Sequence, residues 1–319
     1  MDVICVGILV ADIVASPIDA IPAAGQLKLT DRFLLTVGGC AANTGVDLCR
    51  LGKRVKVLGK VGDDLFGDFI VKDLQRSGVD SSSLSHSTNF PTSGTFILNV
   101  EGQDRRFIHY FGANADFSFT DIDCSALDGG RVVYLGGYLL MPRFGIDDLT
   151  QLFQEARKRS MLTVLDVVVP SGVTAPLDAV KKMLQFTDVF LPNDDEAYSL
   201  TGQKDIFDQA AWFSSVNADC TIVITQGSRG AVVRRGDEVL HAGIYPMKSV
   251  DGSGAGDAFD AGFITGLLEG WPLEKTLRFA SAVGASCTRA LGTTAGVFRF
   301  DEAVRFVEEH PLQIRKVHR

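Results

Sequence analysis

The chain has 319 residues, of which 46% are hydrophobic and 22% are charged, as in ordinary globular proteins. Its net charge of −8 argues against nucleic acid as the main partner, because a phosphate backbone attracts a basic surface. The amino-terminal segment is apolar but carries Asp2 and Asp12 and lacks a basic region, and no run of 18 apolar residues occurs. We therefore expect neither a signal peptide nor a membrane span. The six cysteines form no CxxC pair, which favours reduced thiols in a cytoplasmic protein.

Short β-branched segments alternate with helical patterns along most of the chain. Strands are predicted over 3–8, 54–62, 131–137, 162–168, 188–193 and 221–227, and helices over 43–51, 64–77, 146–159, 194–201 and 208–217. Several strands are apolar on both faces, as parallel strands between two helical layers should be. This order predicts an α/β fold with a doubly wound, mostly parallel sheet and helices on both faces. Ligands of such sheets bind beyond the carboxyl ends of the strands.

Two segments interrupt this alternation. Residues 95–111 alternate in polarity on either side of a short EGQD turn, the pattern of an antiparallel hairpin. The stretch 13–36, with turns at Pro17 and Pro22, is expected to add further strands to it. We therefore expect a single domain over 1–319, with the strands of a small β-sheet lid inserted at about 13–36 and 92–111.

The segment SVDGSGAGDAFD at 249–260 is a glycine-rich loop that leads into a predicted helix. Backbone N–H groups at Gly254, Ala255 and Gly256 are able to converge on an anion, and the helix dipole adds to that attraction. Asp257 is explained there if its carboxylate accepts a proton from a substrate hydroxyl while the loop stabilises a transferring phosphoryl group. The alternative is a glycine-rich turn in which Asp257 is a helix N-cap.

Two further segments place polar groups at the start of predicted helices. In TVGGCAAN, Gly38 and Gly39 permit a polyol to approach the backbone closely, and Asn43 offers both a donor and an acceptor. In LPNDDE, Asn193 ends a strand and Glu196 follows one helical turn later, where both are able to face a nucleotide phosphate and its magnesium. The alternative for Glu196 is an ordinary partner of the helix dipole.

The segment TQGSRG at 225–230 ends another buried strand and forms either a nucleotide shelf or a plain β-turn. Taken in order, GGCAAN, NDDE, TQGSRG and DGSGAGD resemble the PfkB (ribokinase-like) carbohydrate kinase family. The segments GKVGDDLFGDF and FGANADF extend the resemblance over nearly the whole chain. It implies ATP-dependent phosphorylation of a hydroxyl on a sugar or sugar-like molecule. Neither a Walker P-loop nor GxGxxG occurs, which disfavours a dinucleotide-binding Rossmann fold.

The resemblance also implies roles for individual residues. Asp257 matches the catalytic base of the family, and its anion hole is matched by Gly254, Ala255 and Gly256. Four residues match its sugar contacts: Asp12, Gly38, Gly39 and Asn43. Six match its contacts to the ATP and Mg²⁺: Asn193, Glu196, Thr225, Gly227, Ser228 and Gly230. Family members often bind a monovalent cation such as K⁺, whose site would begin at Asp251 and Ser253 and include carbonyls of 286–295.

The chain departs from ribokinases at several of these positions. Cys40 stands where their GGKGAN motif has lysine, and Val10 replaces an asparagine two residues before Asp12. The apolar residues 139–141 stand where ribokinases tend to place a glutamate for the sugar. These differences argue against ribose as the sole substrate and leave a hexose, a modified sugar or a nucleoside open.

Two alternatives concern the substrate and the class of protein. Arg105, Arg106 and His109 on the lid hairpin either bind an acidic sugar or form a solvated strand face. A catalytically silent sensor of sugars or nucleotides is the main alternative to a kinase, because fold does not determine function. The intact Asp257 and its anion loop argue against a sensor.

The predicted lid carries alternating apolar residues and has open sheet edges. Such surfaces usually mark an interface, and an open edge is commonly covered by another strand or chain. Many members of the family that the chain resembles dimerise through their lids. We therefore expect a homodimer built from residues near 13–36 and 95–111.

Overall fold

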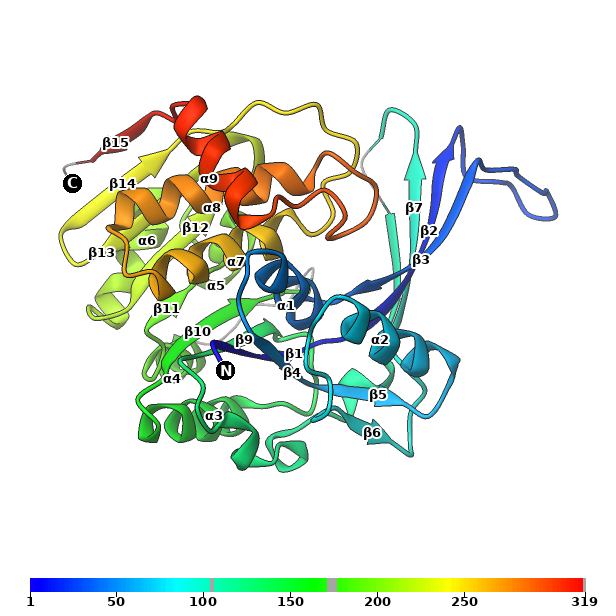
Figure 1. The fold of residues 1–319 in the computed structure, drawn as a ribbon, viewed down its shortest axis with the longest axis horizontal. Coiled ribbons are helices and arrows are strands. Elements are labelled where there is room, and N and C mark those ends of the chain that lie inside the picture. Colours follow the sequence, from blue (N-terminus) through cyan, green and yellow to red (C-terminus); the bar gives the residue numbers. More distant parts are fainter. Residues whose placement is uncertain (104–105, 171–176, 318–319) are drawn as a thin grey trace.

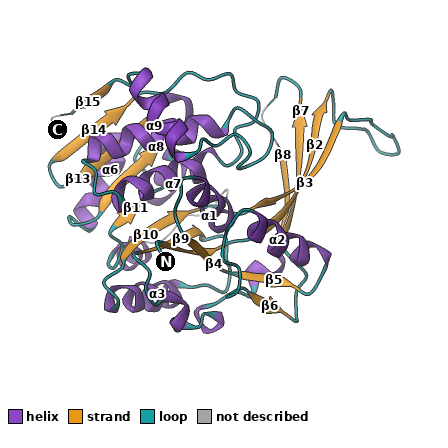
Figure 2. Cartoon of the chain, in the orientation of Figure 1, coloured by secondary structure: helices purple, strands orange, loops and turns teal. Residues whose placement is uncertain are grey.

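The computed structural model describes residues 1–103, 106–170 and 177–317. Its main sheet has nine strands (Figures 1 and 2). Six are parallel, in the order β4 (Val55–Leu58), β1 (Val3–Gly7), β9 (Val132–Tyr138), β10 (Leu162–Val167), β11 (Val189–Phe190) and β12 (Thr221–Thr225). Three antiparallel strands continue the sheet: β13 (Ala231–Arg235), β14 (Glu238–Ala242) and β15 (Ile314–Lys316). The mostly parallel, doubly wound sheet predicted from the sequence is confirmed.

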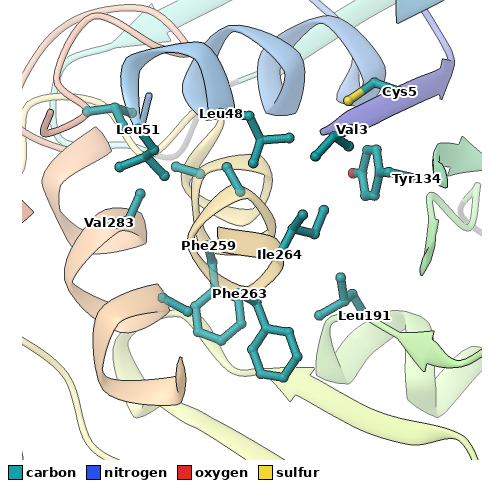
Figure 3. Packing of buried hydrophobic residues seen from close by; sticks show 14 of the residues in the cluster. Val3, Cys5, Leu48, Leu51, Tyr134, Leu191, Phe259, Phe263, Ile264 and Val283 are labelled. Atoms are coloured by element: carbon teal, nitrogen blue, oxygen red, sulfur yellow. The ribbon is translucent and has the colours of Figure 1, made fainter. Parts of the chain in front are cut away.

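Helices cover both faces of this sheet. One face packs on α1 (Cys40–Arg50), α2 (Leu65–Arg76), α7 (Ala255–Leu268), α8 (Leu273–Cys287) and α9 (Phe300–Glu309). The other packs on α3 (Ile146–Lys158), α4 (Leu177–Leu184), α5 (Asp194–Thr201) and α6 (Ile206–Val216). Within β1, Val3 and Cys5 enter the first core while Ile4 and Val6 enter the second, so the strand is apolar throughout. Figure 3 shows side chains of α1, α7 and α8 meeting in the first core.

The four-stranded lid sheet projects from one side of the main domain (Figure 1). Its order is β3 (Arg32–Gly38), β2 (Val10–Ile18), β7 (Gly94–Val100) and β8 (Arg106–Tyr110). The outer pairs are antiparallel, as hairpin-like segments should be, whereas β2 and β7 pair in parallel at the centre. The small sheet is thus assembled from two segments that are distant in the sequence.

The strand predicted over 54–62 is divided in two. The chain leaves the main sheet after β4, and β5 (Lys60–Gly62) pairs with β6 (Ser85–Ser87) in a separate two-stranded sheet. The break falls at Gly59, where a Cβ would lie 2.7 Å from the backbone oxygen of Gly7. Among the described residues, no helix has the length and apolar character needed to cross a membrane.

Candidate active site

Asp257 lies in the first turn of α7 and is not its N-cap. The N-cap residue is Gly254, with φ of 77°. A Cβ at Gly254 would lie 2.2 Å from the backbone oxygen of Thr293, so only glycine fits there. The carboxylate of Asp257 instead accepts a hydrogen bond of 2.8 Å from the side-chain Nδ2 of Asn43. The N-cap interpretation of Asp257 is therefore wrong.

Two cavities meet at the loop that precedes α7. The first, the acceptor cavity, has a volume of about 460 Å³ and is lined by Asp257 and by most of the predicted site residues: Asp12, Gly39, Asn43, Asn193, Glu196, Thr225, Ser253, Gly254, Ala255 and Gly256. The second, the shelf cavity, measures about 600 Å³ and is lined by Thr225, Gly227, Ser228 and Gly230. Four residues line both: Thr225, Gly252, Ala255 and Gly256.

Two predicted residues are not among those lining the two cavities. A Cβ at Gly38 would lie 1.9 Å from Oδ2 of Asp12, so this glycine makes room for that carboxylate. Asp251 is buried, and its carboxylate accepts backbone hydrogen bonds from Ser253 (2.9 Å) and Gly292 (3.1 Å). The carboxylate of Asp251 thus joins the loop before α7 to the segment after α8.

The NDDE and TQGSRG segments have clear local structures. Asn193 and Glu196 form a capping box at the start of α5: Glu196 N–H donates to the Asn193 side chain (2.9 Å), and Asn193 N–H donates to the Glu196 carboxylate (2.8 Å). TQGSRG contains a single 3₁₀ turn between β12 and β13. Its last glycine, Gly230, has φ of 98° and would place a Cβ 2.0 Å from the Ala242 oxygen.

Two buried acids in the acceptor cavity were missed from the sequence. Asp166 is the fifth of the six residues of β10, and its Oδ2 accepts the backbone N–H of Gly137 at 2.9 Å. Asp260 follows Asp257 by one helical turn and accepts the hydroxyl of Tyr134 at 3.1 Å. The sequence signal was an aspartate inside each of two strongly apolar segments. Such a residue is informative because acids are rarely buried unless they have a partner.

The burial of these acids shifts their protonation. Removal from water raises the pKa of Asp12 and of Glu196 to about 7 in each case. Burial also raises the pKa of Asp257, and the hydrogen bond from Asn43 opposes that shift. For Asp166 and Asp260 burial raises the pKa well above its ordinary value, and neighbouring carboxylates add to the effect. Burial therefore favours the protonated forms of the acids in the acceptor cavity.

These shifts predict that stability falls as the pH rises. The folded chain keeps protons on Asp12 and Glu196 that the unfolded chain releases above its ordinary pKa near 4, so this stabilisation is lost as pH rises through about 7. We expect Asp12 to contribute on the order of 2–3 kcal/mol to the difference in unfolding free energy between pH 5 and pH 8. Denaturant unfolding of the metal-free protein measures it.

Two variants test whether Asp12, and not acidic residues in general, causes this pH dependence of the unfolding free energy. Asp12→Asn should reduce the fall in stability between pH 5 and pH 8, because the amide does not titrate in this range. Asp237→Asn, in the exposed turn between β13 and β14, should retain the wild-type slope. An unchanged slope in Asp12→Asn would contradict the assignment.

Residues 1–298 match the model of the pfkB family carbohydrate kinases, so the chain belongs to that family. It is a phosphotransferase with a hydroxyl acceptor. It is 27% identical to a 5-dehydro-2-deoxygluconokinase of Clostridium perfringens over 86% of each chain. It is 26% identical to a ribokinase of Haemophilus influenzae over 89% of this chain and 91% of the relative. The resemblance noted from the sequence is confirmed.

Solved structures agree on the ribokinase-like fold. The chain superposes on a putative ribokinase from Agrobacterium tumefaciens with a TM-score of 0.85 at 20% identity, covering 97% of each chain. It superposes on an Arabidopsis thaliana ribokinase complexed with ribose and ATP with a TM-score of 0.82 at 23% identity, covering 96% of this chain and 98% of the other.

Proposed function

We propose that this single-domain protein transfers the γ-phosphoryl group of ATP to a hydroxyl of a sugar or sugar-like substrate, with Asp257 as the base. The observation that carries the proposal is the position of Asp257 on the wall of the acceptor cavity, next to a loop that lines both cavities. A sugar in the acceptor cavity and ATP in the shelf cavity would meet at this loop. Proteins of the same fold have been solved in complexes with ribose and ATP and with ATP and Mg²⁺, which supports these ligands for the family.

The residues of the site have distinct tasks in this reaction. Asp257 accepts the proton of the substrate hydroxyl, and Asn43 orients its carboxylate. The backbone N–H groups of Ala255 and Gly256 stabilise negative charge on the transferring group. The lid sheet limits the access of water to the acceptor cavity.

Oxygen atoms near the loop before α7 suit the two cations, Mg²⁺ and K⁺, that the sequence suggested. The Glu196 and Asn193 side chains offer the hard oxygen ligands that suit Mg²⁺, which neutralises phosphate charge when bound. We further propose that K⁺ is held near Asp251, Ser253 and the carbonyls of 286–295. We place the activity in the cytoplasm, where ATP is available.

The test is the release of ADP over a panel of acceptors with Mg²⁺, in the presence and absence of K⁺. The panel includes ribose, fructose and 5-dehydro-2-deoxygluconate, chosen from the names of the relatives, together with nucleosides. Saturable ADP release that depends on one acceptor is expected. Acceptor binding without any ADP release would instead favour a silent sensor.

Asp12 should contribute to acceptor binding and not to ATP binding. Asp12 lines the acceptor cavity, and its carboxylate accepts a hydrogen bond from the Thr95 side chain. It does not line the shelf cavity. We expect Asp12→Ala to raise the acceptor KM about 10- to 100-fold, as removal of hydrogen bonds to a charged group does. The ATP KM should change less than threefold. Steady-state kinetics that show both KM values rising together would reject this role.

We propose that the protein is a homodimer through its lid. Large apolar side chains are exposed on or beside the lid strands: Leu27 (88%), Leu29 (83%), Phe33 (64%), Phe107 (56%), Ile108 (66%) and Tyr110 (51%). A surface of this kind is typical of an interface, and the two-fold arrangement of copies is the commonest. Light scattering at micromolar concentration should give twice the chain mass, and Ile108→Lys should give a monomer. A fully active wild-type monomer would contradict the proposal.

A further inference from the structure

The acceptor cavity has an unbalanced set of ionisable side chains. Five carboxylates line it: Asp12, Asp166, Glu196, Asp257 and Asp260. Within residues 1–103, 106–170 and 177–317, no lysine or arginine lies on its wall. The remaining wall is largely apolar, with Val10, Ile97 and Leu140 among its residues. A negative group placed here would be desolvated without a positive partner.

Two residues of the wall each carry a buried side-chain atom without a hydrogen-bond partner. Asn43 is 4% exposed; its Nδ2 donates to Asp257, whereas its Oδ1 is buried without a hydrogen bond. The ring of His109 contacts Thr95 through Nδ1 at 3.0 Å, and its Nε2 is likewise buried without a partner. An amide oxygen accepts only, so an occupant that reached Asn43 Oδ1 would have to donate, as a hydroxyl does.

Two arginines of the lid hairpin were considered as partners for an acidic sugar, and the structure describes one of them. Arg106 is exposed, donates to Gln103 at 2.6 Å and is not on the cavity wall. Arg105 lies outside the described residues. Of the two basic residues of this set that the structure describes, His109 lines the cavity and Arg106 does not, and burial lowers the pKa of the His109 imidazole.

We infer that the acceptor is an uncharged polyol, a sugar or sugar-like molecule that carries neither a carboxylate nor a phosphate. This inference rests on the proposed function and adds the charge of the substrate to it. Hydroxyls satisfy Asn43, His109 and the carboxylates together. An anion would lose its hydration in a site of low dielectric with no lysine or arginine among the described wall residues to pair with it, which costs several powers of ten in the binding constant. The phosphates of ATP would avoid this penalty, because backbone N–H groups of the loop before α7 would donate to them and bound Mg²⁺ would neutralise their charge.

Specificity constants over matched acceptors test the inference. Ribose and fructose serve as neutral acceptors, and gluconate, 5-dehydro-2-deoxygluconate and fructose 6-phosphate as anionic ones. We expect kcat/KM for the best neutral acceptor to exceed that for the best anionic acceptor at least about 100-fold. An anionic acceptor that equals or exceeds the neutral ones would overturn the inference and leave the kinase proposal intact.

A binding measurement keeps the two proposals separable. If a neutral acceptor raises the melting temperature without releasing ADP, the kinase proposal fails and the charge inference stands. If only an anionic acceptor raises it, the charge inference fails whatever the enzymatic result.

A cation introduced into the wall should reduce the preference for neutral acceptors. Leu140 is partly buried on the cavity wall and has no role in the proposed chemistry, so Leu140→Arg should raise kcat/KM for an anionic acceptor at least about tenfold. Leu140→Met is the matched control and should leave the preference unchanged. No gain in a folded Leu140→Arg variant would overturn the inference.

Discussion

Asp257→Asn is expected to lower kcat about 10²–10⁴-fold, the range over which a positioned general base contributes. The amide has the shape of the carboxylate and keeps an oxygen that can accept the hydrogen bond from Nδ2 of Asn43, which is 2.8 Å long in the wild-type protein. It cannot accept the proton of the substrate hydroxyl. The KM for ATP should remain within about threefold of the wild-type value, because ATP is proposed to occupy the other cavity.

The measurement is steady-state ADP release, accompanied by thermal unfolding. Burial raises the pKa of Asp257, so a neutral amide should fold at least as stably as the carboxylate at neutral pH. Asp260→Asn is the matched control, since Asp260 follows by one helical turn on the same wall and is given no role in proton transfer. If Asp257→Asn retains more than a tenth of the wild-type kcat, Asp257 is not the base.

Gly256→Ala should lower the activity without lowering the stability of the fold. No heavy atom lies within 4 Å of the position that a Cβ at Gly256 would occupy, and this residue lines both cavities. In a helix, alanine is more stable than glycine by about 0.5–1 kcal/mol, so the melting temperature should be kept or raised. The methyl group would nevertheless occupy the space of the transferring phosphoryl group. We expect kcat to fall about 100-fold or more, as when an oxyanion donor is lost.

Two other glycines define the comparison. Gly145→Ala, at the N-cap of α3, meets only the Asp148 carboxylate at 3.7 Å and should leave kcat unchanged. Gly254→Ala is less informative, because its positive φ and the 2.2 Å approach to Thr293 would disturb the backbone itself. A stable Gly256→Ala variant with more than a third of the wild-type kcat would mean that no phosphoryl group approaches this loop.

Much of the fold was predictable because its causes are local. A strand such as VICVG must be apolar on both faces when helices cover both sides of it, and the sequence records that directly. The loop before α7 was also readable, since glycines cluster where the backbone needs their conformations. Boundaries were less accurate: α1 begins at Cys40 and not at residue 43, and residues 54–62 form two strands. The division falls at Gly59, where a side chain would collide with the backbone of Gly7 in another strand.

The sequence by itself determined the class of fold, the presence of a lid and the segments that carry the candidate site, because each depends on residues close together in the chain. Only the tertiary structure decided which side chains meet. Asn43 donates to Asp257 across 214 positions, and the Gly38 backbone makes room for the Asp12 carboxylate. Asp166 and Asp260 join the cavity because β10 ends beside the first turns of α7. Strand order and register set these distances, and no local pattern encodes them, so the charge of the cavity emerged only from the folded chain.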